Sequence, residues 1–186
     1  MSARLQTWHE FLILSFFSGL IYFLAYLSSY QLSVSYEFSH ATSWVYLPSG
    51  VRLLLVLVLV GPGAFGIVLG TLFIDYLHQG STDHVYNWIT ALIAGGSAYL
   101  GLKLAQRLLR LQQDLKQLTQ TQLMQICLIF SVVSPLMHQI WYAVHGDTQQ
   151  FWHSAAVMAL GDLGGSVIVL GMLYWSLRLV RALRNP

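Results

Sequence analysis

Residues 11–30 read FLILSFFSGLIYFLAYLSSY, an apolar run of 20 residues without a charged side chain. A helix needs about 20 mostly apolar residues to cross the hydrocarbon core of a bilayer, which is about 30 Å thick. A cleaved signal peptide has a shorter apolar core, whereas this run continues through Tyr26 and Tyr30. The stretch therefore predicts a first membrane-spanning helix that stays in the protein.

The composition of the rest of the chain agrees with this prediction. Of 186 residues, 56% are hydrophobic and only 9% are charged, whereas a soluble domain carries about 25% charged residues. A soluble enzyme, a nucleic-acid-binding protein and a disordered chain are therefore excluded. The single cysteine, Cys127, excludes an intrachain disulfide and a cysteine-based zinc site. We expect one all-α integral membrane domain over residues 1–186.

Hydropathy divides this domain into six expected spans. The second and third are interrupted or short, because 64–77 supplies only about 21 Å of helix. Between them, Gly61-Pro62-Gly63 has the composition of a tight turn, so this pair is predicted to be a short, tilted or partly unwound hairpin. The expected spans are 11–30, 44–60, 64–77, 85–109, 123–144 and 151–177.

Basic residues test this map independently of hydropathy. Alternating the six spans places eight of the nine Lys and Arg residues on the side of the two termini and none in the opposite loops. Cytoplasmic loops are enriched in Lys and Arg, so both termini are predicted to be cytoplasmic. The eight residues are Arg4, Lys103, Arg107, Arg110, Lys116, Arg178, Arg181 and Arg184.

The ninth basic residue, Arg52, falls inside the second span. Arg52 lies nine residues before Gly61 and Asp75 twelve after Gly63, or about 13 and 18 Å along two antiparallel helices. Asp162 in the sixth span is a further acid at this depth, so we expect an Arg52–Asp75–Asp162 cluster. Intramembrane ionisable residues suggest a ligand, ion or proton site. The alternative is that the charges only neutralise each other and fix packing.

The start of the second span could contribute to the same site. Pro48 favours a helix start, whose free N–H groups at Ser49 and Gly50 would form an anion seat one turn before Arg52. Proline at a helix start is equally compatible with ordinary capping. Trp44 is expected to be an interfacial aromatic residue or, as the less favoured alternative, to line a pocket.

The other candidate residues lie in the last three spans. A lone membrane histidine such as His138 is expected to bond to a neighbouring helix more often than to bind haem or a metal. No catalytic residue, metal site or cofactor is predicted. Small residues allow close helix packing. The expected packing residues are Gly95, Gly96, Gly161, Gly164 and Gly165.

The order of these motifs resembles the first family of bacterial membrane-associated sensor domains, the MASE type. The family's Trp-Pro-Pro-Ala-Gly-like segment corresponds to Trp44–Gly50 (WVYLPSG), and its turn to Gly61-Pro62-Gly63. Its third span matches Gly70–Asp75, its small-residue helix Ala94–Arg110, and its closing segment Trp152–Leu170 with Gly161-Asp162-Leu163-Gly164. The resemblance implies the input half of a signalling protein in the bacterial inner membrane.

The chain is expected to depart from this family in three ways: it would lack an output domain, it would have fewer spans, and it carries Arg52 and Asp75 where the family has neutral residues. We therefore expect a non-enzymatic sensor or regulatory module in the lipid bilayer. It would work through a small-molecule ligand or a membrane or cytoplasmic protein partner, without nucleic acid. A substrate-binding transporter subunit or small permease, and a structural subunit of a larger complex, remain alternatives, and a homo-oligomer is left open.

Overall fold

The computed structural model describes residues 7–35, 37–39, 42–80, 82–111, 118–148 and 150–184. These residues form six α-helices, a π-helical turn and a two-stranded antiparallel hairpin. In chain order the elements are α1 (Trp8–Ser35), β1 (Glu37–Ser39), β2 (Thr42–Ser43), α2 (Leu47–Leu59), α3 (Gly61–Phe73), η1 (Ile74–His78), α4 (His84–Leu108), α5 (Gln120–His145) and α6 (Phe151–Arg184).

The predicted all-α class is confirmed, and four helices are long and apolar enough to cross a membrane. Helices α2 and α3 have 13 residues each, which corresponds to about 20 Å. That length is shorter than a hydrocarbon core of about 30 Å. The four long apolar segments are Trp8–Gln31, His84–Leu108, Gln120–His145 and Phe151–Leu183.

The connection between α2 and α3 is tighter than its composition suggests. Gly61 and Pro62 already belong to the first turn of α3, where proline is tolerated because its missing N–H has no helical partner. The reversal is made by Val60 alone, with φ 54° and ψ −104°. A β-branched residue rarely adopts positive φ. The predicted turn at Gly61-Pro62-Gly63 is therefore not formed there. The chain reverses one residue earlier, at the strained Val60.

The third predicted span also changes character before its end. Helix α3 ends at Phe73, and residues Ile74–His78 continue as the π-helical turn η1. The N–H of Gln79 bonds to the carbonyl oxygen of Ile74 at 2.9 Å. Asp75 therefore lies in the π-helical turn and not in a regular α-helix.

Small residues allow α1 to pack closely on α3. A Cβ added to Gly66 would overlap the side chain of Ser18 and the carbonyl oxygen of Ser15, and one added to Gly70 would overlap the carbonyl oxygen of Gly19. Gly66 and Gly70 are four residues apart, the spacing of small residues that brings membrane helices together. Helix α3 also packs on α4, α4 on α5, and both α5 and α2 on α6.

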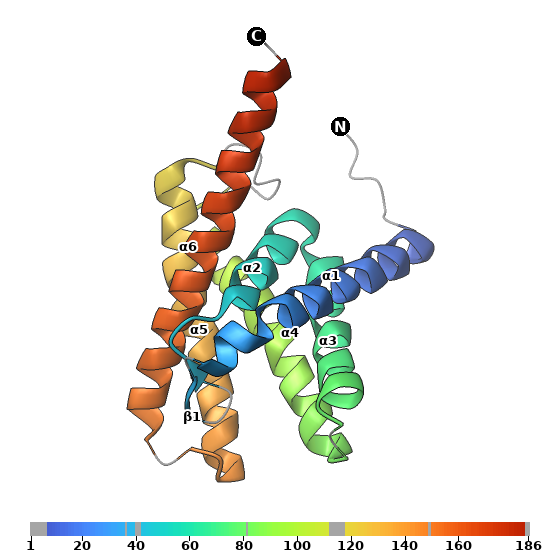
Figure 1. Cartoon of the computed structure of the whole chain (residues 1–186), viewed down its shortest axis with the longest axis vertical. Helices are drawn as coiled ribbons and strands as arrows, with labels where there is room; N and C mark the ends of the chain where they lie inside the picture. Colours follow the sequence, from blue (N-terminus) through green and yellow to red (C-terminus); the bar gives the residue numbers. More distant parts are fainter. Residues whose placement is uncertain are drawn as a thin grey trace.

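The two ends of the molecule differ. The β1–β2 hairpin, the start of α4 and the α5–α6 connection lie at one end, called here the distal end (Figure 1). The last turns of α6 project beyond the other helices at the opposite end (Figure 1). They carry Arg178 and Arg181, and Lys103 and Arg107 lie in the final turns of α4. Arg4 and Lys116, counted with them above, lie outside the described residues.

Candidate functional site

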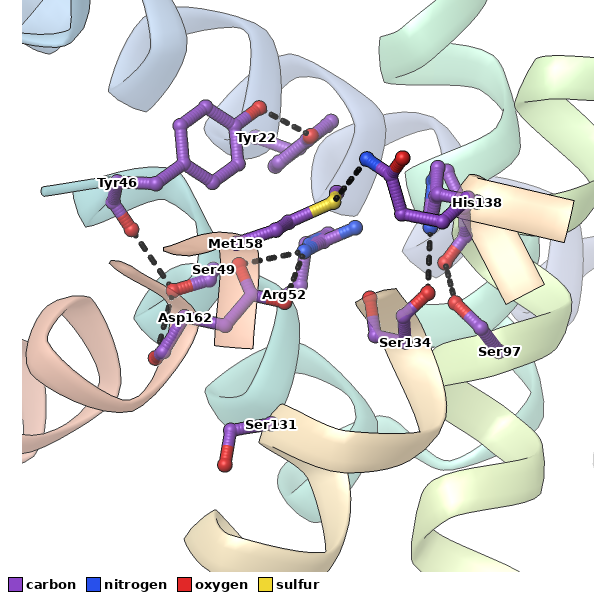
Figure 2. A network of polar contacts seen from close by, with 12 residues as sticks. Tyr22, Tyr46, Ser49, Arg52, Ser97, Ser131, Ser134, His138, Met158 and Asp162 are labelled. Atoms are coloured by element: carbon purple, nitrogen blue, oxygen red, sulfur yellow. Dashed lines mark hydrogen bonds and ion pairs between the residues drawn. The ribbon is translucent and has the colours of Figure 1, made fainter. Parts of the chain in front are cut away.

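An ion pair joins α2 to α6 inside the helix bundle. Nη2 of Arg52 lies 3.2 Å from Oδ1 and 3.1 Å from Oδ2 of Asp162. The exposed fractions of the two side chains are 2% and 0%. Figure 2 shows the guanidinium and the carboxylate facing each other between the two helices. Burying either charge alone costs several kcal/mol. Each charge therefore offsets part of the cost of burying the other.

A serine hydroxyl strengthens the same helix contact. Oγ of Ser49 lies 2.7 Å from the carbonyl oxygen of Tyr46 and 3.0 Å from that of Asp162, so its proton can be donated to either. The Tyr46 N–H in turn donates to the carbonyl oxygen of Gly161 at 3.4 Å. The first turn of α2 is thereby attached to the backbone of α6 (Figure 2).

Glycines make this approach possible. A Cβ added to Gly161 would overlap the carbonyl oxygen of Ser43, and one added to Gly165 would overlap that of Tyr46. On the facing helix, a Cβ on Gly50 would overlap the carbonyl oxygen of Gly165. The glycine segment of α6 therefore receives the start of α2 at backbone-to-backbone distance.

The predicted anion seat is not open to solvent. Pro48, Ser49 and Gly50 are all buried against α6, and the Ser49 N–H bonds to the carbonyl oxygen of Tyr46 at 3.2 Å. The prediction of an anion seat at this helix start is therefore wrong, because packing covers the free N–H groups. Trp44 is 45% exposed.

Aromatic rings surround the guanidinium of Arg52. Its Cζ lies 5.7 Å from the ring centroid of Tyr46 and 5.5 Å from that of Phe130, which are cation–π distances. The Tyr46 hydroxyl is 3.2 Å from that of Tyr22, on α1. Nε of Arg52 is buried and has no hydrogen-bond partner among the described residues. The site therefore keeps one unused N–H donor beside a neutralised ion pair.

Asp75 does not join this pair. It is half-buried in η1 and forms no hydrogen bond or ion pair with another described residue. Helix α2 presents Arg52 to α6, whereas α3 packs on α1 and α4. The predicted three-residue cluster is therefore a two-residue ion pair and a separate acid, because distance along a helix does not specify which way the helix faces.

His138 and its neighbour Gln139 are buried on α5. Nδ1 of His138 lies 2.8 Å from the carbonyl oxygen of Ser134, one turn earlier in the same helix. This hydrogen bond is therefore within α5, whereas a bond to a neighbouring helix was expected. Gln139 makes the contact between elements, because its Nε2 donates to Oγ1 of Thr42 at 3.1 Å. No group of three or more His, Cys, Asp or Glu residues suited to a metal ion occurs in the described ranges.

Two predicted packing glycines do not pack. A Cβ added to Gly96 or Gly164 would meet no atom within 4 Å. Gly95, the neighbour of the first, faces the carbonyl oxygen of Ala64 on α3. Adjacent helical residues point about 100° apart, so only one glycine of each pair can face a given neighbour.

Tyr22 and Gln139 take part in this network but were not among the residues predicted from the sequence. A signal for Tyr22 was present, since Ser15, Ser18 and Tyr22 follow each other at helical spacing in an otherwise apolar span. Gln139 stands beside His138 without any such pattern. Gln139 is therefore recognised only from its partners in the fold.

Comparison of the chain with protein-family models, with curated proteins and with solved structures finds no match.

Proposed function

We propose that this chain is a non-enzymatic membrane module of the sensor or regulatory type, which responds when a small ligand or a protein partner acts at the Arg52–Asp162 pair. The supporting observation is the complete burial of this pair together with the unused Nε donor of Arg52. Ionisable residues at membrane depth are costly and usually mark functional sites.

The location of the pair makes it suited to a conformational response. The pair lies where the first turn of α2 is attached to α6, and α6 continues as a helix to Arg184. A ligand that accepted a hydrogen bond from Arg52 would weaken the attachment to Asp162. The shift of α2 against α6 would then reach the projecting end of α6. The MASE-type resemblance of the sequence agrees with this role, and we place the module in a bacterial inner membrane with both termini cytoplasmic.

A substrate-binding subunit of a transporter is the second candidate. Helix α2 is too short to cross a membrane, and it meets α3 at a strained residue, Val60. Secondary transporters place their binding sites at short or broken helices of this kind. This candidate shares the Arg52–Asp162 pair as a binding site but requires energy-coupling partners.

The test is purification from native membranes in mild detergent, followed by native mass spectrometry. We compare the unmodified protein with the double variant Arg52→Gln/Asp162→Asn, which removes both charges and so leaves no uncompensated one. The proposal expects a small molecule or a stoichiometric partner on the unmodified protein that is absent from the variant.

The other outcomes separate the alternatives. A bound pair of ATPase subunits supports the transporter candidate, whereas a partner retained equally by the variant indicates a structural subunit. If the unmodified protein carries neither ligand nor partner, the proposed function is wrong.

A further inference from the structure

We propose that residues 42–46, called here the strap, close the distal side of the Arg52–Asp162 pair and have to be released before a ligand reaches it. This inference rests on the proposed function and deepens it, because it states how access to that same site is controlled. Access can be measured without a ligand, so the two proposals are tested separately.

The strap lies between the distal end and the pair. Helix α2 begins at Leu47, directly after the strap, and Arg52 follows within its first two turns. Helix α6 starts at the distal end (Figure 1), and Gly161, which contacts the strap, comes one residue before Asp162. The ring centroid of Tyr46 lies 5.7 Å from Cζ of Arg52. A ligand that approaches from the distal end therefore meets the strap before it meets the pair.

The strap is buried although it is not helical. Thr42 and Ser43 are only 1% and 8% exposed, and the strand that they form, β2, packs on α6. Connecting segments normally run over the surface of a protein. Irregular backbone at membrane depth is tolerated only inside protein or beside a water-filled cavity. The burial of this segment therefore needs a reason, and a closure over the charged pair supplies one.

Hydrogen bonds attach the strap to three different helices. Nε2 of Gln139 on α5 donates to Oγ1 of Thr42 at 3.1 Å, and the hydroxyl oxygens of Tyr46 and of Tyr22 on α1 lie 3.2 Å apart. The N–H of Tyr46 donates to the carbonyl oxygen of Gly161 on α6 at 3.4 Å. Usual distances are about 2.9 Å for N–H···O and about 2.8 Å for O–H···O bonds. These three bonds are longer, so they hold the strap only weakly to the helices.

Buried polar atoms without partners lie behind the strap. Oε1 of Gln139, Oγ of Ser134 and Nε of Arg52 have no hydrogen-bond partner among the described residues. The ring of Phe130 lies 5.5 Å from Cζ of Arg52, and Ser134 and His138 follow Phe130 at four-residue spacing, on the same face of α5 (Figure 2). Buried polar atoms normally have partners. A molecule that passed the strap would therefore meet free donors and acceptors.

The test measures how fast a thiol behind the strap is modified in the full chain in lipid nanodiscs. Ser134→Cys introduces this thiol where the hydroxyl has no partner among the described residues. The reagent is methanethiosulfonate ethylammonium, whose charge keeps it out of lipid. Thr42→Val and Tyr46→Phe each remove one hydroxyl from the bonds of the strap and nearly keep the side-chain volume. We expect each change to speed labelling about threefold, and both together about tenfold or more.

Two controls separate release of the strap from loosening of the whole bundle. Cys127 is buried on α5, two turns before the introduced thiol, so its labelling in the same sample reports unfolding. Thr90→Val removes a hydroxyl that accepts a hydrogen bond from Nε1 of Trp141 at 3.0 Å, between α4 and α5. It is the same substitution outside the strap, and it should change labelling of the introduced thiol less than about twofold.

The inference is wrong if Thr42→Val/Tyr46→Phe changes labelling of the introduced thiol less than about twofold, or if this thiol already reacts as fast as an exposed one when the strap is unmodified. It is also wrong if Cys127 becomes reactive in parallel, or if Thr90→Val gives the same acceleration. If the double variant does not fold, the two single variants decide. Because no ligand takes part, failure of the strap and failure of the proposed function are distinguishable.

Discussion

At the scale of single residues, the Arg52–Asp162 pair places two opposite charges inside the helix bundle. Both side chains are buried, and one guanidinium nitrogen serves both carboxylate oxygens. Such a pair contributes little net stability, because desolvation of the two ions offsets their attraction. Removing one partner is different, because the remaining charge stays buried without compensation.

We therefore predict strong non-additivity in a double-mutant cycle. Arg52→Gln or Asp162→Asn alone should lower the free energy of unfolding by about 3 kcal/mol or more, whereas the double variant should lose much less than the sum. The measurement is SDS titration in mixed micelles, followed by circular dichroism.

Lys103→Gln provides the control for this cycle. Lys103 bonds to Oε1 of Gln106 at 3.2 Å near the end of α4, in a partly exposed setting. The change should stay within about 0.5 kcal/mol. Simple addition of the two single effects would show that Arg52 and Asp162 do not act as a pair.

At the scale of elements, glycines decide which helices touch. In the neighbouring glycines 164 and 165 of α6, only Gly165 faces another backbone, that of Tyr46. In the pair on α4, only Gly95 does so, facing Ala64. Each pair thus contains its own internal control, since both members have the same helix propensity.

We predict opposite effects of alanine within each pair. Gly164→Ala and Gly96→Ala should raise stability by up to about 1 kcal/mol, because alanine favours helix and nothing obstructs its methyl group. Gly165→Ala and Gly95→Ala should lower the midpoint of thermal unfolding, because the methyl group overlaps a carbonyl oxygen and forces the helices apart. Thermal unfolding in detergent, followed by circular dichroism, measures all four variants. Equal effects within a pair would contradict the helix contacts described above.

At the scale of the whole molecule, the two ends differ in charge. The projecting part of α6 carries basic residues, whereas the distal end has Asp83 and Asp147 next to helix ends. Because basic segments are retained in the cytoplasm, the distal end is expected to face the opposite compartment. This orientation follows from charge and is independent of how the helices pack.

Cysteine labelling in intact cells tests the orientation. Cys127 is buried, so introduced cysteines report without a competing reactive thiol. Thr82→Cys at the distal end should react with a membrane-impermeant maleimide in intact cells. Ala182→Cys on α6 should react only after the membrane is permeabilised. Labelling of Ala182→Cys in intact cells would reverse the predicted topology.

Predictions that needed only the composition of a local stretch agree with the structure, whereas predictions that needed the direction of a side chain agree only in part. The existence of the long helices was well predicted, because the hydropathy of an apolar run such as residues 11–30 depends only on the residues within that run. The neighbourhood of Arg52 was predicted only in part, since Asp162 and Asp75 were equally plausible partners by depth. The failures at Gly96 and Gly164 share one cause. Composition shows that a residue is small, but it does not show which neighbouring helix its Cα faces.

The sequence alone determined that this chain is helical and apolar enough for a membrane, that two of its helices are short, and that three charges lie among apolar residues. The tertiary structure decided that Arg52 pairs with Asp162, that Asp75 stays apart from this pair, and that α2 is attached to the glycine segment of α6. Hydropathy and charge are added up along the chain, so they can be read from the sequence without knowing which residues are in contact. Ion pairing and close packing depend on the rotation of each helix about its axis, which is set only when all helices pack together.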